Sequence, residues 1–173
     1  TYELPFLTHA NLEPLNCSAR IANGELHIWG PMQNPHLAHT VGVSISGLPP
    51  EKVFVHDTFI GGGLGRKAEI DFVQEAVAIA KASGKGIRLM WSREDDTKHG
   101  AYRSAAYVQM EGALDAKGGM TALRVKLTSP SVIARALPPL IQNGVDPFMV
   151  DGLHNLNYDV PNYEAEALIH EVG

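Results

Sequence analysis

The sequence has a single cysteine, no surplus of positive charge and no long hydrophobic run. One cysteine, Cys17, cannot form an internal disulfide and falls short of the Cys/His sets that hold zinc. The 14 Lys and Arg residues are outnumbered by 19 Asp and Glu residues, and the net charge of -5 argues against a nucleic-acid partner. No apolar run approaches the roughly 20 residues of a transmembrane helix, so we expect no membrane span.

Length and composition indicate one ordinary hydrophobic core. At 173 residues and 45% hydrophobic content, a single domain is the natural expectation, and two small lobes are the alternative. The chain begins at Thr1 without a signal peptide or basic leader and ends at "IHEVG", which is typical of a fragment or processed piece. Its compartment is left open between the bacterial cytoplasm and the periplasm.

Hydrophobic periodicity predicts a mixed α/β (α+β) fold of strand–helix–strand units plus an antiparallel hairpin. Leu37, Val41 and Ile45 recur at helical spacing, and Gly47 stands where a helix C-cap would. A second helix is predicted over residues 68–83. The other elements expected are strands at 25–31, 52–57, 86–92 and 162–172, a hairpin at 104–129, and a short helix with loops across 130–160.

The segment "HDTFIGGGLGRKAEIDF", residues 56–72, places a glycine-rich loop between a predicted buried strand and a predicted helix. Successive glycines let backbone N–H groups converge on one point. Because N–H groups are hydrogen-bond donors, the expected ligand is an anion or a partly negative oxygen. The dinucleotide pattern G-x-G-x-x-G fails because Arg66 or Ala68 stands at its last position. The phosphate loop fails because Arg66 and Lys67 follow Gly65. A simple tight turn is the alternative, although the flanking cations count against it.

Four motifs in a fixed order resemble one enzyme family. "GGGLGRK" (61–67) resembles the Gly-Gly-Gly-Phe-Gly-(Gly/Arg)-(Lys/Arg) loop of the molybdenum-binding subunit of the xanthine dehydrogenase and aldehyde oxidase family. The companion segments are "HANLEPLNCSA" (9–19), "IWGPMQNP" (28–35) and "WSREDDTKHGAYR" (91–103). The arginine in the loop and the "HGAYR" ending favour the isoquinoline 1-oxidoreductase beta-subunit branch. Residues 1–173 would then be the first portion of the molybdopterin-binding domain, expressed as a fragment.

This resemblance implies a molybdenum hydroxylase that hydroxylates small aromatic N-heterocycles or oxidises aldehydes with oxygen taken from water. The implied cofactor is molybdopterin with molybdenum, in its cytosine dinucleotide form. Iron–sulfur clusters would sit on a partner alpha subunit or domain, because this chain has no cysteine set to hold one.

The resemblance also implies roles for particular residues. Gln33 and the loop residues Gly61, Gly62, Gly63, Leu64 and Gly65 would bind the cofactor, with backbone N–H groups near Gly63 and Leu64 donating to an oxygen on the molybdenum. Arg103 would orient the substrate. No side chain is expected to ligate the metal directly. The family's catalytic glutamate lies in a Gly-x-Gly-Glu segment that is absent here, so this chain alone should be inactive.

Several plainer interpretations stand beside these roles. Gln33 could cap the following helix, and Arg103 could be a surface residue or a partner of Asp95 or Asp96. Residues 93–96 are expected to form a turn with Asp caps rather than a metal site. His36 and His39 are expected to be solvated or capping side chains. For the whole chain, the rivals are a non-catalytic phosphate- or nucleotide-binding α/β domain and an interaction module without a small ligand.

Overall fold

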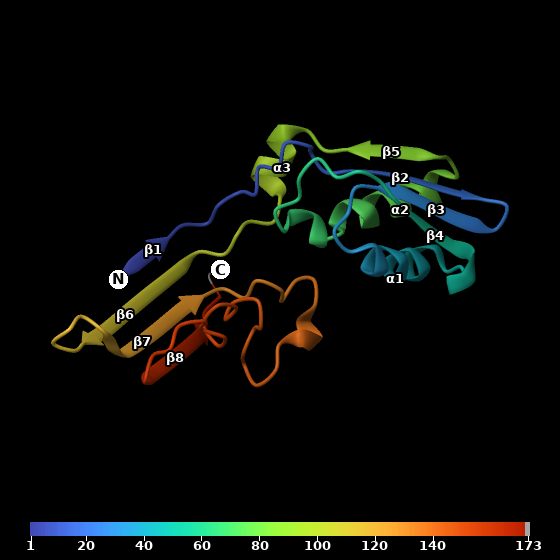
Figure 1. The fold of residues 1–173 in the computed structure, drawn as a ribbon. Helices are drawn as coiled ribbons and strands as arrows, with labels where there is room; N and C mark the ends of the chain where they lie inside the picture. Colours follow the sequence, from blue (N-terminus) through green and yellow to red (C-terminus); the bar gives the residue numbers. More distant parts are fainter. Residues whose placement is uncertain (172–173) are drawn as a thin grey trace. The chain divides into compact units, whose positions relative to one another are not determined.

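A computed structural model describes residues 1–171, which form two compact units. One unit is Thr8–Tyr102, and the other combines Thr1–Leu7 with residues 103–171. Each unit has its own four-stranded sheet (Figure 1). No helix within residues 1–171 is long and apolar enough to cross a membrane.

The sheet of the Thr8–Tyr102 unit has the strand order β4-β3-β2-β5. β2 and β3 form an antiparallel hairpin, turned by Asn23 and Gly24 at φ values of 53° and 75°. β4 runs parallel to β3, and β5 runs antiparallel to β2. The strands are β2 (Asn16–Ala22), β3 (Glu25–Gly30), β4 (Val53–Asp57) and β5 (Ile87–Met90).

Two helices connect the parallel strands of this unit. α1 (Pro35–Ser46) follows β3, and a 3-10 turn (Pro50–Lys52) leads from it into β4. α2 (Asp71–Ser83) lies between β4 and β5. Gly47 and Gly84 end the two helices in the left-handed conformation, as their positions in the sequence predict. A third helix, α3 (Arg93–His99), follows β5 and begins with a capping box between Ser92 and Asp95.

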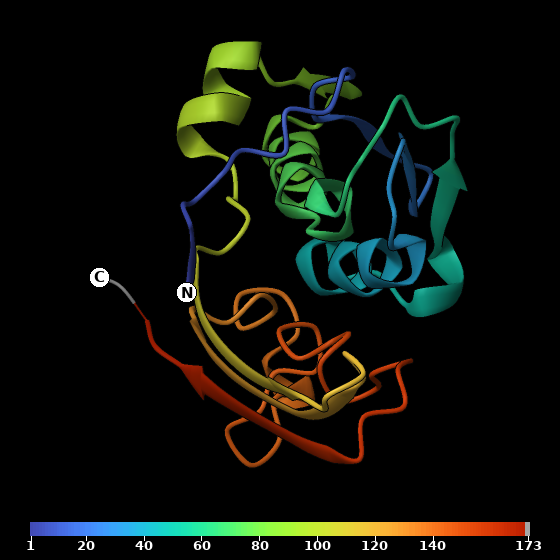
Figure 2. The same cartoon turned by 60° about the vertical axis from the view of Figure 1, so that its left-hand side comes forward.

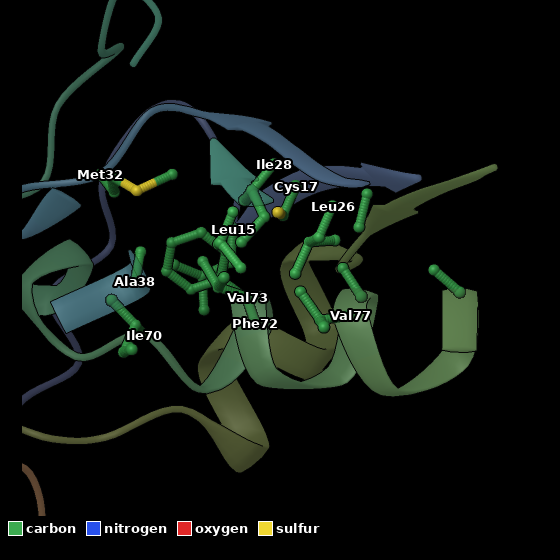
Figure 3. Close-up of a cluster of buried hydrophobic side chains, with 14 residues drawn as sticks. Leu15, Cys17, Leu26, Ile28, Met32, Ala38, Ile70, Phe72, Val73 and Val77 are labelled. Carbon is green, nitrogen blue, oxygen red and sulfur yellow. The ribbon is translucent and has the colours of Figure 1, made fainter. Parts of the chain in front are cut away.

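The core of the unit lies between the sheet and the helices α1 and α2 (Figure 3). The sheet contributes the buried residues Cys17, Ala19, Leu26, Ile28 and Val53, and α2 contributes Phe72, Val73, Ala76, Val77 and Ala80. Gly42 lets α1 approach the sheet closely, because a Cβ there would lie 2.9 Å from Ile28 Cδ1 and 3.1 Å from Val53 Cγ1.

The second unit is built on a sheet of order β1-β6-β7-β8. Its central hairpin is the one predicted at 104–129, and β8 pairs in parallel with β7. Figure 2 shows the long connection between β7 and β8 folded over the concave side of this sheet. That connection contains one 3-10 turn, Pro138–Leu140. The strands are β1 (Tyr2–Leu4), β6 (Ala106–Leu114), β7 (Met120–Ser129) and β8 (Asn162–Ile169).

The mixed α/β prediction is confirmed, and three local predictions are corrected. The strand at 53–57 is real but lies at the sheet edge with only Val53 buried. Residues 93–96 begin a helix rather than a turn, because the Ser92 cap satisfies its first N–H groups. The second helix begins at Asp71, three residues later than Ala68, after a 3-10 turn at Arg66–Ala68.

Candidate functional site

The glycine loop and Gln33 meet at one end of the β4-β3-β2-β5 sheet. Gln33 follows the carboxyl end of β3 and the loop follows the carboxyl end of β4. These two strands are parallel neighbours, with Gly30 paired to Asp57, so their exits lie side by side. Ligands of α/β sheets commonly bind beyond the carboxyl ends of parallel strands. Because β2 is antiparallel to β3, its amino end lies at the same end of the sheet. The segment before Asn16 therefore lies beside the loop.

The loop backbone takes conformations that favour glycine. Gly62, Leu64 and Gly65 have φ values of 90°, 51° and 99°, all in the left-handed region. Gly63 is buried, whereas Leu64 is 60% exposed and extends away from the core. The loop closes on itself through Arg66 N–H, which donates to the Gly63 carbonyl at 2.8 Å. Because a 3-10 turn follows, the loop does not lie at the first turn of α2, and that helix's dipole is not aimed through it.

Gln33 is joined to the loop by a hydrogen bond. The backbone N–H of Gly65 donates to Gln33 Oε1 at 3.1 Å. This bond orients the exposed amide, because its oxygen is held against the loop and its NH₂ group must point elsewhere. Within residues 1–171, the Nε2 atom of Gln33 makes no hydrogen bond to another protein atom. The helix α1 is capped by Asn34 Oδ1, which accepts from Leu37 N–H at 3.0 Å, so the plainer interpretation of Gln33 as the cap is wrong.

Gly63 leaves room for Gln33. A Cβ built on Gly63 would overlap Gln33 Oε1 and would lie 2.8 Å from its Cδ atom, closer than side chains approach. A Cβ on Gly61 would meet Glu13 in the same way, 2.6 Å from its Cβ. The glycines therefore let the loop pack directly onto two side chains that reach it from distant parts of the sequence.

Glu13 is hydrogen-bonded to the first glycine of the loop, Gly61. Its Oε2 atom accepts from Gly61 N–H at 2.8 Å and from Lys67 Nζ at 2.6 Å, and its Oε1 accepts from Asn16 Nδ2 at 3.1 Å. Its own backbone N–H donates to the Gly61 carbonyl at 3.1 Å. Burial alone would raise the pKa of Glu13, but the hydrogen bonds from Lys67, Gly61 and Asn16 outweigh it and lower the pKa.

Arg66 and Lys67 point into the protein. Both side chains are at most 1% exposed. Arg66 forms a bidentate pair with Asp71, at 2.8 and 2.6 Å, and its guanidinium lies 5.6 Å from the ring centroid of Trp91. The two cations therefore do not count against a simple tight turn as the sequence suggested, because each charge is already neutralised by a carboxylate of the same unit.

Three residues beside the loop were not singled out from sequence. His9 Nδ1 donates to the Ala101 carbonyl at 3.1 Å, and its Nε2 atom lies 3.6 Å from where a Cβ of Gly65 would be. Asn11 is buried under Gly62, with its Nδ2 group donating to the Glu13 carbonyl at 2.6 Å. Arg93 donates to the carbonyls of Asn11 and Leu12. The spacing of the "HANLEP" motif was the signal that could have identified the first two.

Arg103 belongs to the other unit. Its backbone forms an antiparallel bridge with Leu7, and its side chain is exposed. Asp96 pairs with Arg93 at 2.6 Å, and Asp95 completes the Ser92 capping box. His39 donates to the Pro50 carbonyl at 3.0 Å, as expected of a capping side chain. Among residues 1–171 there is no group of three or more His, Cys, Asp or Glu that could hold a metal ion.

These features fit a group bound through its own oxygen atoms rather than through metal-ligating side chains. The loop offers backbone N–H groups without Cβ atoms in the way, and Gln33 offers a neutral NH₂ donor beside them. A phosphate is a poorer fit, because the two nearby cations are buried and paired. The fold and the site together define an α/β domain whose glycine loop and Gln33 present hydrogen-bond donors at one end of the sheet.

Comparison with known proteins identifies the cofactor class. The family described as "Molybdopterin cofactor-binding domain" matches residues 1–169. The chain is 32% identical over 151 residues to the beta subunit of isoquinoline 1-oxidoreductase from Brevundimonas diminuta. This match covers 85% of the chain and 19% of that subunit. The chain belongs to the molybdopterin cofactor-binding domain family of the xanthine dehydrogenase and aldehyde oxidase type, and it spans about a fifth of this relative's length.

Solved structures share the fold. CO dehydrogenase from Oligotropha carboxidovorans matches with a TM-score of 0.65 and 28% identity, over 73% of this chain and 16% of that one. The aldehyde oxidoreductase from Desulfovibrio gigas matches over 99% of this chain and 19% of that one, with a TM-score of 0.77. At 18% identity the second match speaks for the fold alone. The resemblance stated from the four sequence motifs is thus confirmed at the level of the family.

Proposed function

We propose that the glycine loop and Gln33 bind the molybdenum cofactor in an intact oxidoreductase subunit, of which this chain is the first portion of the molybdopterin-binding domain. The observation that carries the proposal is the 3.1 Å hydrogen bond from Gly65 N–H to Gln33 Oε1. It joins two segments 32 residues apart into one site and turns the amide NH₂ group outward as a donor.

The bound molybdenum–pterin group would supply the redox chemistry for hydroxylating an N-heterocycle or oxidising an aldehyde with oxygen from water. The residues of this chain would bind and orient it. Gln33 Nε2 would donate to an oxygen of the cofactor, and backbone N–H groups near Gly63 and Leu64 would donate beside it. Because hydrogen bonds from Gly61 to Glu13 and from Gly65 to Gln33 fix the loop, little reorganisation would accompany binding.

Further parts of the enzyme are proposed from the family. Arg103 would orient the substrate, and a partner alpha subunit or domain would carry iron–sulfur clusters that accept the electrons. The cofactor would be the cytosine dinucleotide form of molybdopterin. A catalytic glutamate in a Gly-x-Gly-Glu segment would lie in another part of the intact subunit. The 173-residue chain by itself would therefore show no turnover.

Replacing Gln33 by leucine tests the proposal. Gln33→Leu removes the amide donor from an exposed position, so the subunit should fold normally. In the intact subunit we expect the variant to lower molybdenum content and to reduce turnover by about 100-fold, the usual cost of losing one such donor. The matched control is Gln74→Leu, which changes an exposed glutamine of α2 and should leave both quantities unchanged.

The opposite result would overturn the proposal. If Gln33→Leu kept wild-type molybdenum content and turnover, the loop and Gln33 would not be the cofactor site. Stabilisation of the wild-type chain by nucleotides or phosphate, measured by thermal shift, would favour a phosphate-binding domain instead.

A further inference from the structure

Lys67 is a fully buried cation directly after the glycine loop. Its side chain is 0% exposed, and its only ion-pair partner within residues 1–171 is Glu13, at 2.6 Å. A buried ammonium group without its counter-charge is strongly unfavourable, because the protein interior solvates charge poorly. The pair therefore constrains Lys67 and Glu13 to stay together, although they are 54 residues apart in the sequence.

The same carboxylate that neutralises Lys67 also holds the start of the loop. Glu13 Oε2 accepts from Gly61 N–H at 2.8 Å, and Glu13 N–H donates to the Gly61 carbonyl at 3.1 Å. Both backbone groups of Gly61 are thus hydrogen-bonded to Glu13. The Gly61 N–H group bonds to the Glu13 side chain, and the Gly61 carbonyl bonds to the Glu13 backbone N–H group. Gly61 is the residue that allows this approach, since a Cβ there would overlap Glu13.

Lys67 also connects to Gln33. The Lys67 carbonyl accepts from Gln33 N–H at 2.9 Å, so the backbone that carries the buried cation also fixes the backbone of the proposed amide donor. A continuous set of contacts runs from Glu13 through Lys67 to Gln33, and from Glu13 through Gly61 into the loop. Displacement of the Glu13 carboxylate would disturb both halves of the site.

We propose that Glu13 is a positioning residue of this site, which holds the glycine loop and Gln33 in their binding geometry by neutralising Lys67 and accepting from Gly61 N–H. The proposal rests on the proposed function, since it concerns the same loop. In this role Glu13 acts through the loop, which it contacts at Gly61. The hydrogen bonds that lower the pKa of Glu13 keep its carboxylate charged at neutral pH, as this role requires.

The test separates charge from shape with two variants in the intact subunit. Glu13→Gln keeps an oxygen that can accept from Gly61 N–H but leaves Lys67 buried without a counter-charge. The double variant Glu13→Gln with Lys67→Met removes both charges and fills the Lys67 volume with an apolar side chain. Glu94→Gln is the matched control, because Glu94 is an exposed carboxylate of α3 in the same unit.

Amide hydrogen exchange and activity per molybdenum atom are the two measurements. In Glu13→Gln we expect exchange of residues 58–68 to accelerate about tenfold or more, since an uncompensated buried charge favours local opening. Exchange within α2 should stay at the wild-type rate. Activity per molybdenum atom should fall in Glu13→Gln, return toward wild type in the double variant, and stay unchanged in Glu94→Gln.

Each contrary outcome is distinct. Unchanged loop exchange in Glu13→Gln would overturn the positioning role, and so would a double variant that exchanges as fast as the single one. Faster loop exchange with unaltered activity per molybdenum atom would overturn the link to the site. If Glu13→Gln does not fold, the double variant still decides, because the charge argument requires it to fold with a wild-type loop. Failure of the underlying function would appear separately, as wild-type molybdenum content in Gln33→Leu.

Discussion

Arg66 and Lys67 are two consecutive cations that are buried inside the protein. From sequence alone, two cations directly after a glycine loop suggest an exposed basic site. Each finds a carboxylate: Asp71 on the first turn of α2 for Arg66, and Glu13 for Lys67. Buried charges occur in proteins almost only when paired in this way. The consequence is that Arg66 and Lys67 offer no free charge to a ligand of the loop, and the proposed donors are backbone N–H groups and Gln33.

Leu64 replaces the phenylalanine usual at this position of the family loop. Its φ of 51° is in the left-handed region, which a branched side chain adopts at a cost. The side chain is largely exposed, so the exchange of phenylalanine for leucine changes the surface beside the loop and not the core. The backbone donor at this position does not depend on which of the two side chains is present.

Cys17 is predicted to be chemically inert in the folded protein. It is 1% exposed, and burial raises the pKa of its thiol from 9.0 to about 12. Its thiolate fraction at pH 8 should therefore be smaller by roughly a thousandfold than that of an ordinary thiol. Alkylation by iodoacetamide at pH 8, followed by mass spectrometry, should label Cys17 only when urea is present. Rapid labelling of the native protein would contradict this burial.

At the scale of elements, α3 shows how local capping can create a helix without an apolar stripe. Its sequence, "REDDTKH", is polar throughout, so hydrophobic periodicity did not indicate it. Ser92 Oγ accepts from Asp95 N–H at 3.0 Å, and the Asp95 carboxylate accepts in return from Ser92. The helix matters for the site because Arg93 and Asp96 at its start support the segment that contains Asn11.

Removal of the cap should weaken α3 measurably. Ser92→Ala is expected to cost about 1 kcal/mol of stability, the typical value for a lost N-cap. The control in the same helix is Thr97→Ala, which should be neutral or slightly stabilising because alanine favours helices more than threonine does. Urea unfolding of the two variants gives the comparison. Equal stability of Ser92→Ala and wild type would show that the capping box does not hold this helix.

Asp146 organises the long connection between β7 and β8. Its carboxylate is 0% exposed and accepts from Ser131 Oγ at 2.7 Å and from the backbone N–H groups of Val132, Ile133, Phe148 and Met149. Burial alone would raise the pKa of Asp146, but these hydrogen bonds outweigh it and lower the pKa below 3.8. The ordinary Asx-turn chemistry of a loop aspartate is here extended to two turns.

The connection should consequently be sensitive to acid. A lowered pKa stabilises the fold above pH 3.8, and this stabilisation is lost as pH falls through the lower pKa of the folded state. Hydrogen exchange of residues 131–149 should therefore show protection at pH 6 that declines below pH 3.8 and is lost as pH falls through the lower pKa of folded Asp146. Asp146→Asn should lose on the order of 3 kcal/mol at neutral pH, since several charge-assisted hydrogen bonds are weakened. Acid-independent protection in the wild type would contradict the role given to this carboxylate.

For the whole molecule, the sequence predicts the connected elements better than the long-range contacts. The helical spacing of Leu37, Val41 and Ile45 and the glycine at 47 located α1, and the alternating residues of 104–129 located the hairpin. β2 was missed because Asn16–Ala22 consists mostly of small and polar residues with weak strand preference. Its strand conformation comes from pairing with β3 and β5 on both sides.

The order of the motifs in the sequence predicted which segments form the candidate site. It did not predict how these segments are arranged in space. Four separate motifs could be assigned to one family, which the match over residues 1–169 confirms. The burial of Lys67 could not be predicted, because it depends on a carboxylate 54 residues away. The contact of Gly65 with Gln33 likewise requires that β3 and β4 lie side by side in parallel. Which residues bind the cofactor remains a prediction that mutation must test.

The measurement that tests the central proposal most directly is the molybdenum content of the purified intact subunit, compared between wild type, Gly63→Ala and Gly86→Ala. A Cβ at Gly63 overlaps Gln33 Oε1 and should push the exposed Gln33 amide out of its position beside the loop, whereas a Cβ at Gly86 would lie 3.8 Å from its nearest neighbour, Arg20. We predict that wild type and Gly86→Ala retain molybdenum and that Gly63→Ala is purified with clearly less of it, because a loss of roughly 1.4 kcal/mol weakens binding about tenfold. Wild-type molybdenum content in a folded Gly63→Ala subunit would contradict the assignment of this loop as the cofactor site.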